Sequence, residues 1–129
     1  ALSCDLNVAG SDTRFGFPEI RHGLVPALAM PILARHLGRK LAFDLISSGR
    51  MLGAEDLLRL GLVAEVVPPE AVEARALAIA EAWAERDPAA LAACKALLAE
   101  VADIGFEAGL EAGRRVNEAI RGAREAVAG

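Results

Sequence analysis

Residues 14–26 read RFGFPEIRHGLVP, and this stretch decides how the rest of the chain is interpreted. Glu19 follows Pro18 directly and has apolar neighbours in sequence, among them Phe17 and Leu24. A carboxylate placed among apolar side chains loses hydration, which favours its protonated form unless a partner compensates. The glycines and prolines of the stretch predict a loop instead of a helix. The question is therefore why a loop of this kind carries a glutamate.

Two interpretations of Glu19 stay open on the residues alone. It is either a structural carboxylate paired with Arg14, Arg21 or His22, or an acid/base that is kept for chemistry. At this point the paired carboxylate is the better interpretation, because structural ion pairs shift the pKa of a carboxylate just as active sites do. His22 is interpreted as a polar loop residue, since no other titratable residue converges on it.

The composition predicts a single domain whose helices pack through small side chains. The 129 residues are 54% hydrophobic but only 4% aromatic, with no Tyr, and alanine is abundant. Alanine has the highest helix propensity, and a chain of this length can bury one core. The net charge of -4 comes without a basic stripe, so a nucleic-acid partner is excluded.

Cysteine and histidine are too few for a disulfide framework or a metal site. Cys4 and Cys94 are interpreted as free, buried thiols in a reducing cytoplasm. His22 and His36 are the two histidines, and no CxxC spacing accompanies them, so no metal is predicted. The longest apolar run, residues 24–34, is short and contains two prolines, which argues against a membrane association.

The predicted elements change from mixed to all-helical near residue 68. Extended segments are predicted at residues 5–9, 13–17 and 62–67, and short helices at 27–37, 39–48 and 54–60. Gly38 separates the first two helices and Gly61 caps the third. Longer helices are predicted at 70–86, 89–101 and 106–127. The segment 5–9 has no hairpin partner, so we expect a parallel sheet with neighbours upstream, and a chain that is part of a longer protein.

Three blocks of sequence, in this order, resemble one known family. The first is CDLNVAGSDTRFGFPEIRHGLVP at residues 4–26, in which Phe15, Pro18, Glu19, Gly23 and Pro26 fit the pattern F-x-x-PE-x-x-x-G-x-x-P. The second is SG at 48–49 followed by AEDLLRLGLV at 54–63, and the third is the helix that starts near Pro88 and contains Lys95. In order and spacing these blocks are similar to those of the enoyl-CoA hydratase/isomerase family, the crotonases.

The resemblance implies an α/β fold of the ClpP/crotonase kind, a spiral of parallel strands and helices. This chain would be only its C-terminal part and would end in an all-helical segment. Residues 1–68 would be the C-terminal part of the crotonase core. Residues 69–129 would be the helical segment through which the family forms homotrimers or dimers of trimers.

The resemblance also implies an enzyme that acts on an acyl-CoA thioester, by hydration of a 2-enoyl-CoA with Glu19 as acid/base. Substrate-binding residues would be Phe17, Pro18, Gly23 and Leu24 around it. No cofactor is implied beyond the coenzyme A of the substrate, and no metal. The alternatives are an enoyl-CoA isomerase, a decarboxylase, a thioester hydrolase, or a truncated fragment that acts only in assembly.

The chain departs from the family pattern in two places. A second glutamate in a G-G-G-x-E turn and the backbone donors of an oxyanion hole lie upstream in the family, and residues 1–129 contain neither motif. Residues 27–30 read ALAM where GAGG is usual, which gives a bulkier helix start and leaves the acyl preference open. Near the end, Arg114, Arg115, Arg121 and Arg124 could meet coenzyme A phosphates, but a solvated helix face is the better interpretation.

Overall fold

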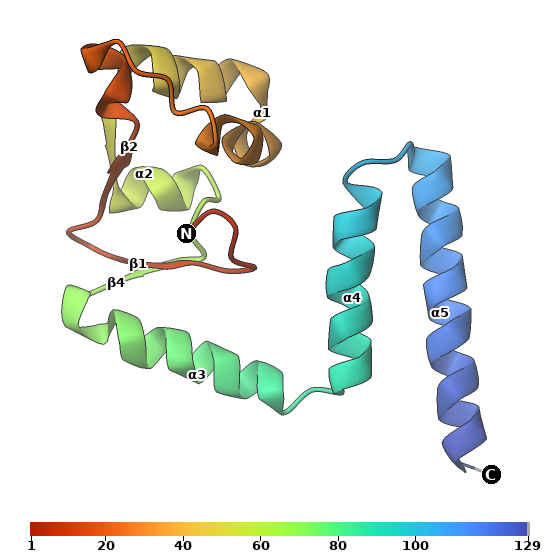
Figure 1. The fold of residues 1–129 in the computed structure, drawn as a ribbon. Coiled ribbons are helices and arrows are strands. Elements are labelled where there is room, and N and C mark those ends of the chain that lie inside the picture. The colour runs from red at the N-terminus through yellow and green to blue at the C-terminus, as the bar shows by residue number, and fades with distance from the viewer. Residues whose placement is uncertain (129) are drawn as a thin grey trace. The chain divides into compact units, whose positions relative to one another are not determined.

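The computed structural model describes residues 1–128, with only the backbone for residues 124, 127 and 128 (Figure 1). The chain divides into two compact units, Ala1–Ile79 and the part that begins at Ala80. This division falls inside a helix, and the boundary expected at residue 68 stays a prediction. Gly129, the last residue of the predicted helical segment, lies outside the described residues, as does the side chain of Arg124.

The first unit contains two small sheets. In one, β1 (Val8–Gly10) pairs in parallel with β4 (Glu65–Val67), and in the other, β2 (Arg14–Gly16) pairs antiparallel with β3 (Met51–Gly53). The expected parallel strand near residue 8 is confirmed. One partner of β1, the strand β4, lies downstream in this same chain, and the expectation of a further neighbour upstream stays a prediction. Strand β3 was not predicted, because three residues are too few to show an alternating pattern.

Short and kinked helices connect these strands. The 3-10 helix η1 (Pro18–His22) occupies the stretch that was expected to be a loop, and Pro18 fits its first position because no N–H is needed there. Helix α1 (Ala29–Ser48) is kinked at Gly38, whose φ of 68° and ψ of 163° suit glycine alone. The predicted break at Gly38 is thereby confirmed.

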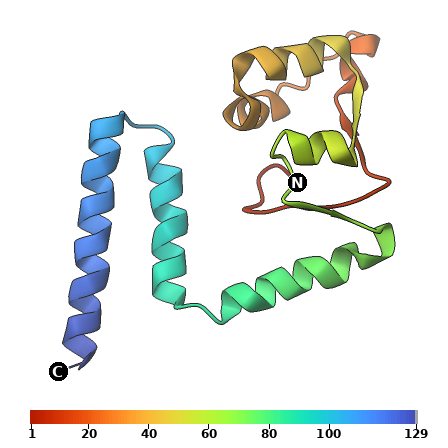
Figure 2. The ribbon, with the colours of Figure 1, turned by 180° about the vertical axis from the view of Figure 1, so that it is seen from behind.

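Helix α2 (Ala54–Arg59) lies between the two sheets and contacts strands of both (Figures 1 and 2). Its N-terminus is closed by Asp56, whose side chain accepts a hydrogen bond from the Gly53 N–H at 3.2 Å. That bond, together with Arg59, holds the pKa of Asp56 below its usual value. At the other end Gly61 is left-handed, and the N–H groups of Gly61 and Leu62 close the helix on Leu58 and Leu57, as predicted for a glycine cap.

One hydrophobic core holds the first unit together. Leu33 and Leu45 of α1 and Leu52 of β3 are completely shielded from solvent. Phe17 is also buried in this core and packs edge-on against Phe15 with ring centroids 5.4 Å apart. The residue that directly precedes η1 is therefore anchored in the core. The 3-10 helix η2 (Pro69–Ala71) then leads from β4 into α3 (Val72–Ala84).

The second unit contains α4 (Pro88–Val101) and α5 (Phe106–Ala128), which run antiparallel and side by side (Figures 1 and 2). Asp87 begins α4, since its Oδ1 accepts a hydrogen bond from the Ala90 N–H at 2.9 Å. The seam between the helices is made of small and medium side chains: Ala90, Ala93, Leu97 and Val101 from α4, with Gly109, Ala112, Gly113, Val116 and Ile120 from α5. Small side chains let the two backbones approach closely.

Several large apolar side chains of these two helices lie outside the seam. Leu98 is 71% exposed and Phe106 is 81% exposed, and Cys94 is exposed as well. The interpretation of Cys94 and Cys4 as buried thiols is therefore wrong, for Cys4 is exposed too. Within residues 1–128 we find no helix with the length and apolar character that crossing a membrane requires.

Candidate active site

The turn that carries Glu19 is fixed at both ends by its backbone. Phe17 precedes it in the core, and Gly23 ends it with a φ of 71°, a left-handed conformation. The N–H of Gly23 donates to the Ile20 carbonyl and the N–H of Leu24 donates to the Glu19 carbonyl, both at 3.1 Å. The left-handed glycine lets the chain fold back on η1, so the backbone of Glu19 is part of a closed turn.

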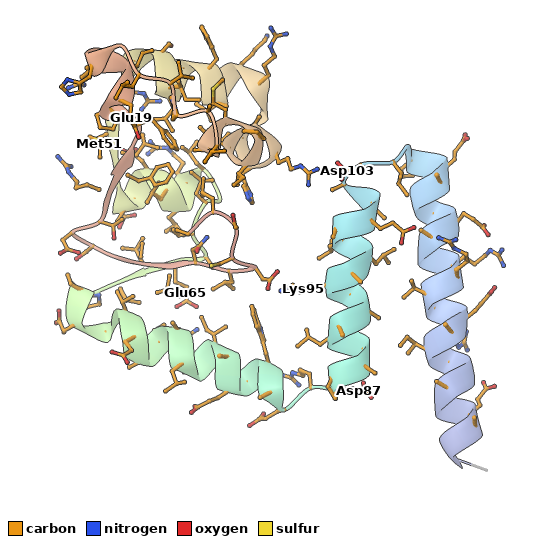
Figure 3. All side chains as sticks on the ribbon, viewed as in Figure 1. Glu19, Met51, Glu65, Asp87, Lys95 and Asp103 are labelled. Carbon is orange, nitrogen blue, oxygen red and sulfur yellow. The ribbon has the colours of Figure 1, made fainter. Side chains whose placement is uncertain are left out.

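The carboxyl group of Glu19 is unusual among the described residues. The side chain is half-buried, and its Oε2 atom is shielded from solvent without a hydrogen-bond partner among the described residues. A shielded oxygen without a partner costs free energy and calls for an explanation, such as a role in binding or catalysis. Figure 3 shows Glu19 and Met51 at the same end of the first unit.

The ion pair that could have explained Glu19 is not formed in the described part of the chain. Arg14, Arg21 and His22 are all exposed, and none of them makes an ion pair with Glu19. The alternative of a structural carboxylate paired with one of these residues therefore has no support from the geometry. His22 faces solvent, as a polar loop residue would.

The four predicted substrate-binding residues lie in two different environments. Phe17 is buried in the core beneath the turn, whereas Pro18, Gly23 and Leu24 are exposed, with Leu24 at 60%. The structure thus brings Pro18, Gly23 and Leu24 to the surface near the Glu19 carboxyl and gives Phe17 a supporting position. Their contact with a substrate stays a prediction.

Metal ligands do not gather anywhere in the described residues. No group of three His, Cys, Asp or Glu side chains there is arranged to hold a metal ion. The Nε2 atom of His36 forms a hydrogen bond with the carbonyl oxygen of Leu2 at 2.9 Å. His36 borders a surface pocket of about 400 Å³ that also includes Cys4 and Asp5.

The arginines of α5 are engaged on the surface of the helix pair. Arg114 pairs with Glu111 and with Glu118, both at 2.7 Å, which raises the pKa of Arg114 through these hydrogen bonds and lowers that of Glu111. Arg115 reaches across to Glu100 of α4 at 3.0 Å. Both are exposed, so the solvated face is the interpretation that the geometry favours for them.

One segment that contacts the Glu19 turn was not predicted from the sequence. Gly49, Arg50 and Met51 follow α1 directly and lie against residues on both sides of Glu19. Gly49 ends a helical pattern and belongs to the second family block, and neither signal indicates a contact with the neighbours of Glu19. The contact joins residues about thirty positions apart and has no local sequence pattern.

Comparison with known proteins identifies the class of this chain. The family model described as enoyl-CoA hydratase/isomerase matches residues 1–125. Curated relatives include a putative enoyl-CoA hydratase of Thermus thermophilus, 37% identical over 94% of this chain and 48% of its own length. Another is the 2,3-dehydroadipyl-CoA hydratase of Escherichia coli, 37% identical over 90% of this chain and 46% of its own length.

A solved structure agrees with these relatives. The enoyl-CoA hydratase of Mycobacterium smegmatis superposes with a TM-score of 0.86 at 31% identity, over 92% of this chain and 46% of its own. The fold and the matched sequence together define a crotonase-fold chain. The chain belongs to the enoyl-CoA hydratase/isomerase family, and it spans about half the length of the relatives it matches.

Proposed function

We propose that this chain supplies one acid/base of an enzyme that hydrates a 2-enoyl-CoA, with Glu19 as that group. The observation that supports this most is the Oε2 atom of Glu19, which is shielded from water and has no hydrogen-bond partner among the described residues. The family and the names of its relatives support an acyl-CoA substrate. Because the chain spans half of those relatives, the proposal concerns the complete protein that carries it.

Hydration needs two proton transfers that a carboxyl group can perform. The oxygen of water bonds to the β-carbon, the electrons of the double bond pass to the thioester oxygen, and the α-carbon then takes a proton as the enolate collapses. One group must accept a proton from water and one must donate a proton to the α-carbon. Glu19 can fill either role, because its Oε2 is not committed to another side chain.

The surroundings of Glu19 suit an acyl thioester. Leu24 and Pro18 offer exposed apolar surface beside the turn, and Phe17 stiffens it from below. The coenzyme A portion enters as part of the substrate, and we propose no further cofactor. Donors for the enolate oxygen would come from a part of the complete enzyme outside these residues, where fixed N–H groups typically contribute a few kcal/mol.

The test is Glu19→Gln in the complete protein, assayed by the loss of the conjugated double bond of a 2-enoyl-CoA. Gln keeps the shape and polarity of the turn but transfers no proton, so kcat should fall by about 10²–10⁴-fold with KM little changed. Glu19→Asp should recover little, because the shorter side chain withdraws the carboxyl from the reacting carbon.

Glu73→Gln is the matched control, because Glu73 is exposed on α3 and undergoes the same chemical change. It should leave kcat within about twofold of the parent, in line with exposed substitutions in general. A well-folded Glu19→Gln protein with the parent kcat would refute the assignment. Activity toward a 3-enoyl-CoA or thioester hydrolysis, with no hydration, would favour the isomerase or hydrolase alternatives.

We further propose that the complete protein assembles as a homotrimer through its helical segment and acts in the cytoplasm in fatty acid metabolism. Leu98 and Phe106 support the assembly, since they present apolar surface that the α4–α5 seam leaves exposed. Light scattering at increasing protein concentration tests this. Leu98→Asp with Phe106→Asp should give monomers, and a parent protein that is monomeric at all concentrations would refute it.

A further inference from the structure

The three-residue segment Gly49–Met51 packs against the Glu19 turn. One of its contacts is with the residues of the turn that follow Glu19. Gly49 is buried and left-handed, with a φ of 59°, and it ends α1. A Cβ atom built on Gly49 would lie 3.0 Å from the Cγ2 atom of Ile20 and 3.1 Å from the Nε atom of Arg21. These two residues follow Glu19 directly in η1, so a side chain at Gly49 would press on η1 through the side chains of Ile20 and Arg21.

The same segment also supports the turn from its N-terminal side. A Cβ atom on Gly16 would lie 2.6 Å from the carbonyl oxygen of Arg50 and 2.7 Å from the Sδ atom of Met51. Gly16 is paired with Met51 in the register of β2 and β3. Residues 49–51 thus come close to the chain at two places, at Gly16 just before η1 and at Ile20 and Arg21 within η1. Glu19 lies between these two places in the chain.

The segment is itself fixed to α1. Arg50 pairs with Asp44 through its Nη2 at 2.9 Å and its Nε at 3.3 Å, and its backbone N–H donates to the Oγ atom of Ser48 at 3.3 Å. Leu45 and Leu52, on either side of the segment in the chain, are both completely buried. The segment that faces the turn is thus tied to α1 and flanked in the chain by two core residues.

We propose that Gly49 is a positioning residue for Glu19: it sets the place of η1 and so the position of the Oε2 atom relative to the substrate. This inference rests on the proposed function of Glu19. Catalysis by a carboxyl group depends steeply on its position, and a displacement of about 1 Å can cost about 10²-fold in rate. An added methyl group at Gly49 would require the Ile20 and Arg21 side chains to give by a few tenths of an ångström, and we expect part of this displacement to reach η1, which carries both.

The test compares Gly49→Ala with Gly61→Ala in the complete protein. Gly61 also caps a helix in a left-handed conformation, with a φ of 70°, but a Cβ atom there meets nothing within 4 Å. Both variants carry the strain of a left-handed alanine and should lose a similar amount of thermal stability. Only Gly49→Ala should lower kcat, by about 10–10²-fold with KM little changed.

Amide hydrogen exchange gives a second readout that does not depend on activity. The N–H groups of Gly23 and Leu24, which close the Glu19 turn, should exchange faster in Gly49→Ala than in Gly61→Ala. Adding Ile20→Ala to Gly49→Ala removes the nearest atom in conflict, Cγ2, and leaves only contacts with the exposed Arg21 side chain, which can turn toward solvent, so kcat should return to that of Ile20→Ala alone. If Gly49→Ala does not fold, recovery of folding and of kcat in this double variant supports the proposal, and failure of either refutes it.

Glu19→Gln in the same assay separates the two proposals. If Glu19→Gln keeps the parent kcat, the proposed function fails, and the positioning role fails with it. If Glu19→Gln is inactive while Gly49→Ala matches Gly61→Ala in kcat and in exchange of the turn amides, Glu19 remains catalytic and the positioning role of Gly49 is overturned.

Discussion

Arg75 holds Glu65 through two hydrogen bonds, from Nε to Oε2 at 2.7 Å and from Nη2 to Oε1 at 2.5 Å, and thereby joins α3 to β4. The pair lowers the pKa of Glu65 and raises that of Arg75, in both cases chiefly through the side-chain hydrogen bond. Parallel, two-pronged contacts of this kind are the stronger ion pairs at protein surfaces. β4 is also the partner of β1, so this pair ties α3 to the parallel sheet.

Arg75→Met should destabilise the protein in a pH-dependent way. Because the pKa of Glu65 is lowered in the folded state, the pair stabilises the fold above the unfolded value, near 4.5, and this contribution is lost as the pH falls through the folded pKa. The Tm difference between parent and variant should therefore be largest near pH 7 and should shrink below pH 4.5. An equal difference at pH 3 and pH 7 would contradict the ion-pair explanation.

Asp87→Ala should weaken the start of α4. The substitution removes the side chain that accepts from the Ala90 N–H, and loss of such a cap costs about 1 kcal/mol. Faster exchange of the Ala90 amide should accompany a small fall in Tm. Asp87→Asn is the control, since Asn caps helices about as well as Asp. If Asp87→Asn and Asp87→Ala were equally destabilising, charge and not capping would explain the role of Asp87.

Leu33→Ala should be among the most damaging core substitutions. Leu33 is 0% exposed, and shortening a buried leucine to alanine costs about 2–5 kcal/mol because a cavity remains. Leu28→Ala makes the same change five positions earlier, where the side chain is 92% exposed, and should stay within about 0.5 kcal/mol of the parent. Denaturant unfolding measures both. Equal effects at the two positions would mean that another surface covers Leu28.

The sequence was most informative where glycine and proline determine the backbone. Gly38 breaks α1, Gly61 ends α2, and Pro88 begins α4 after its Asp87 cap, all as predicted. These residues act through their own backbone dihedrals or a bond to a near neighbour, so a local pattern is enough to find them. The family resemblance is confirmed by the family model that matches residues 1–125.

Prediction failed where packing between segments distant in the sequence determines which residues are buried. Cys94 was expected to be buried, yet it is exposed, and the buried side of α4 runs along Ala90, Ala93, Leu97 and Val101. On the facing helix Ala112 is 1% exposed, so a small side chain is buried where no hydrophobic pattern stands out. A single sequence does not show which face of an apolar helix meets a neighbour.

For the candidate site, the sequence identified the carboxyl group but not what surrounds it. Glu19 and its neighbours in RFGFPEIRHGLVP are adjacent in the chain, so one motif predicts them all. The missing ion pair and the contacts of Gly49 with Ile20 and Arg21 depend on how α1 returns to η1. Such relationships are set by the tertiary fold and leave no periodic signal in the sequence.

The glycine that divides α1 has a consequence for how this chain can diversify. Gly38 joins residues 29–37 to residues 39–48 with φ and ψ values that no helix adopts. The twist and the axis of one piece therefore do not carry over to the other. Substitutions in the first piece and just before it, where residues 27–30 read ALAM, can change the surface beside Leu24. The second piece, which ends at Gly49, shares one core with Leu33 of the first, so only the exposed positions of the first piece can change without disturbing it. If Glu19 has the proposed role, the break at Gly38 would let those exposed positions alter substrate preference while the Glu19 turn keeps its support.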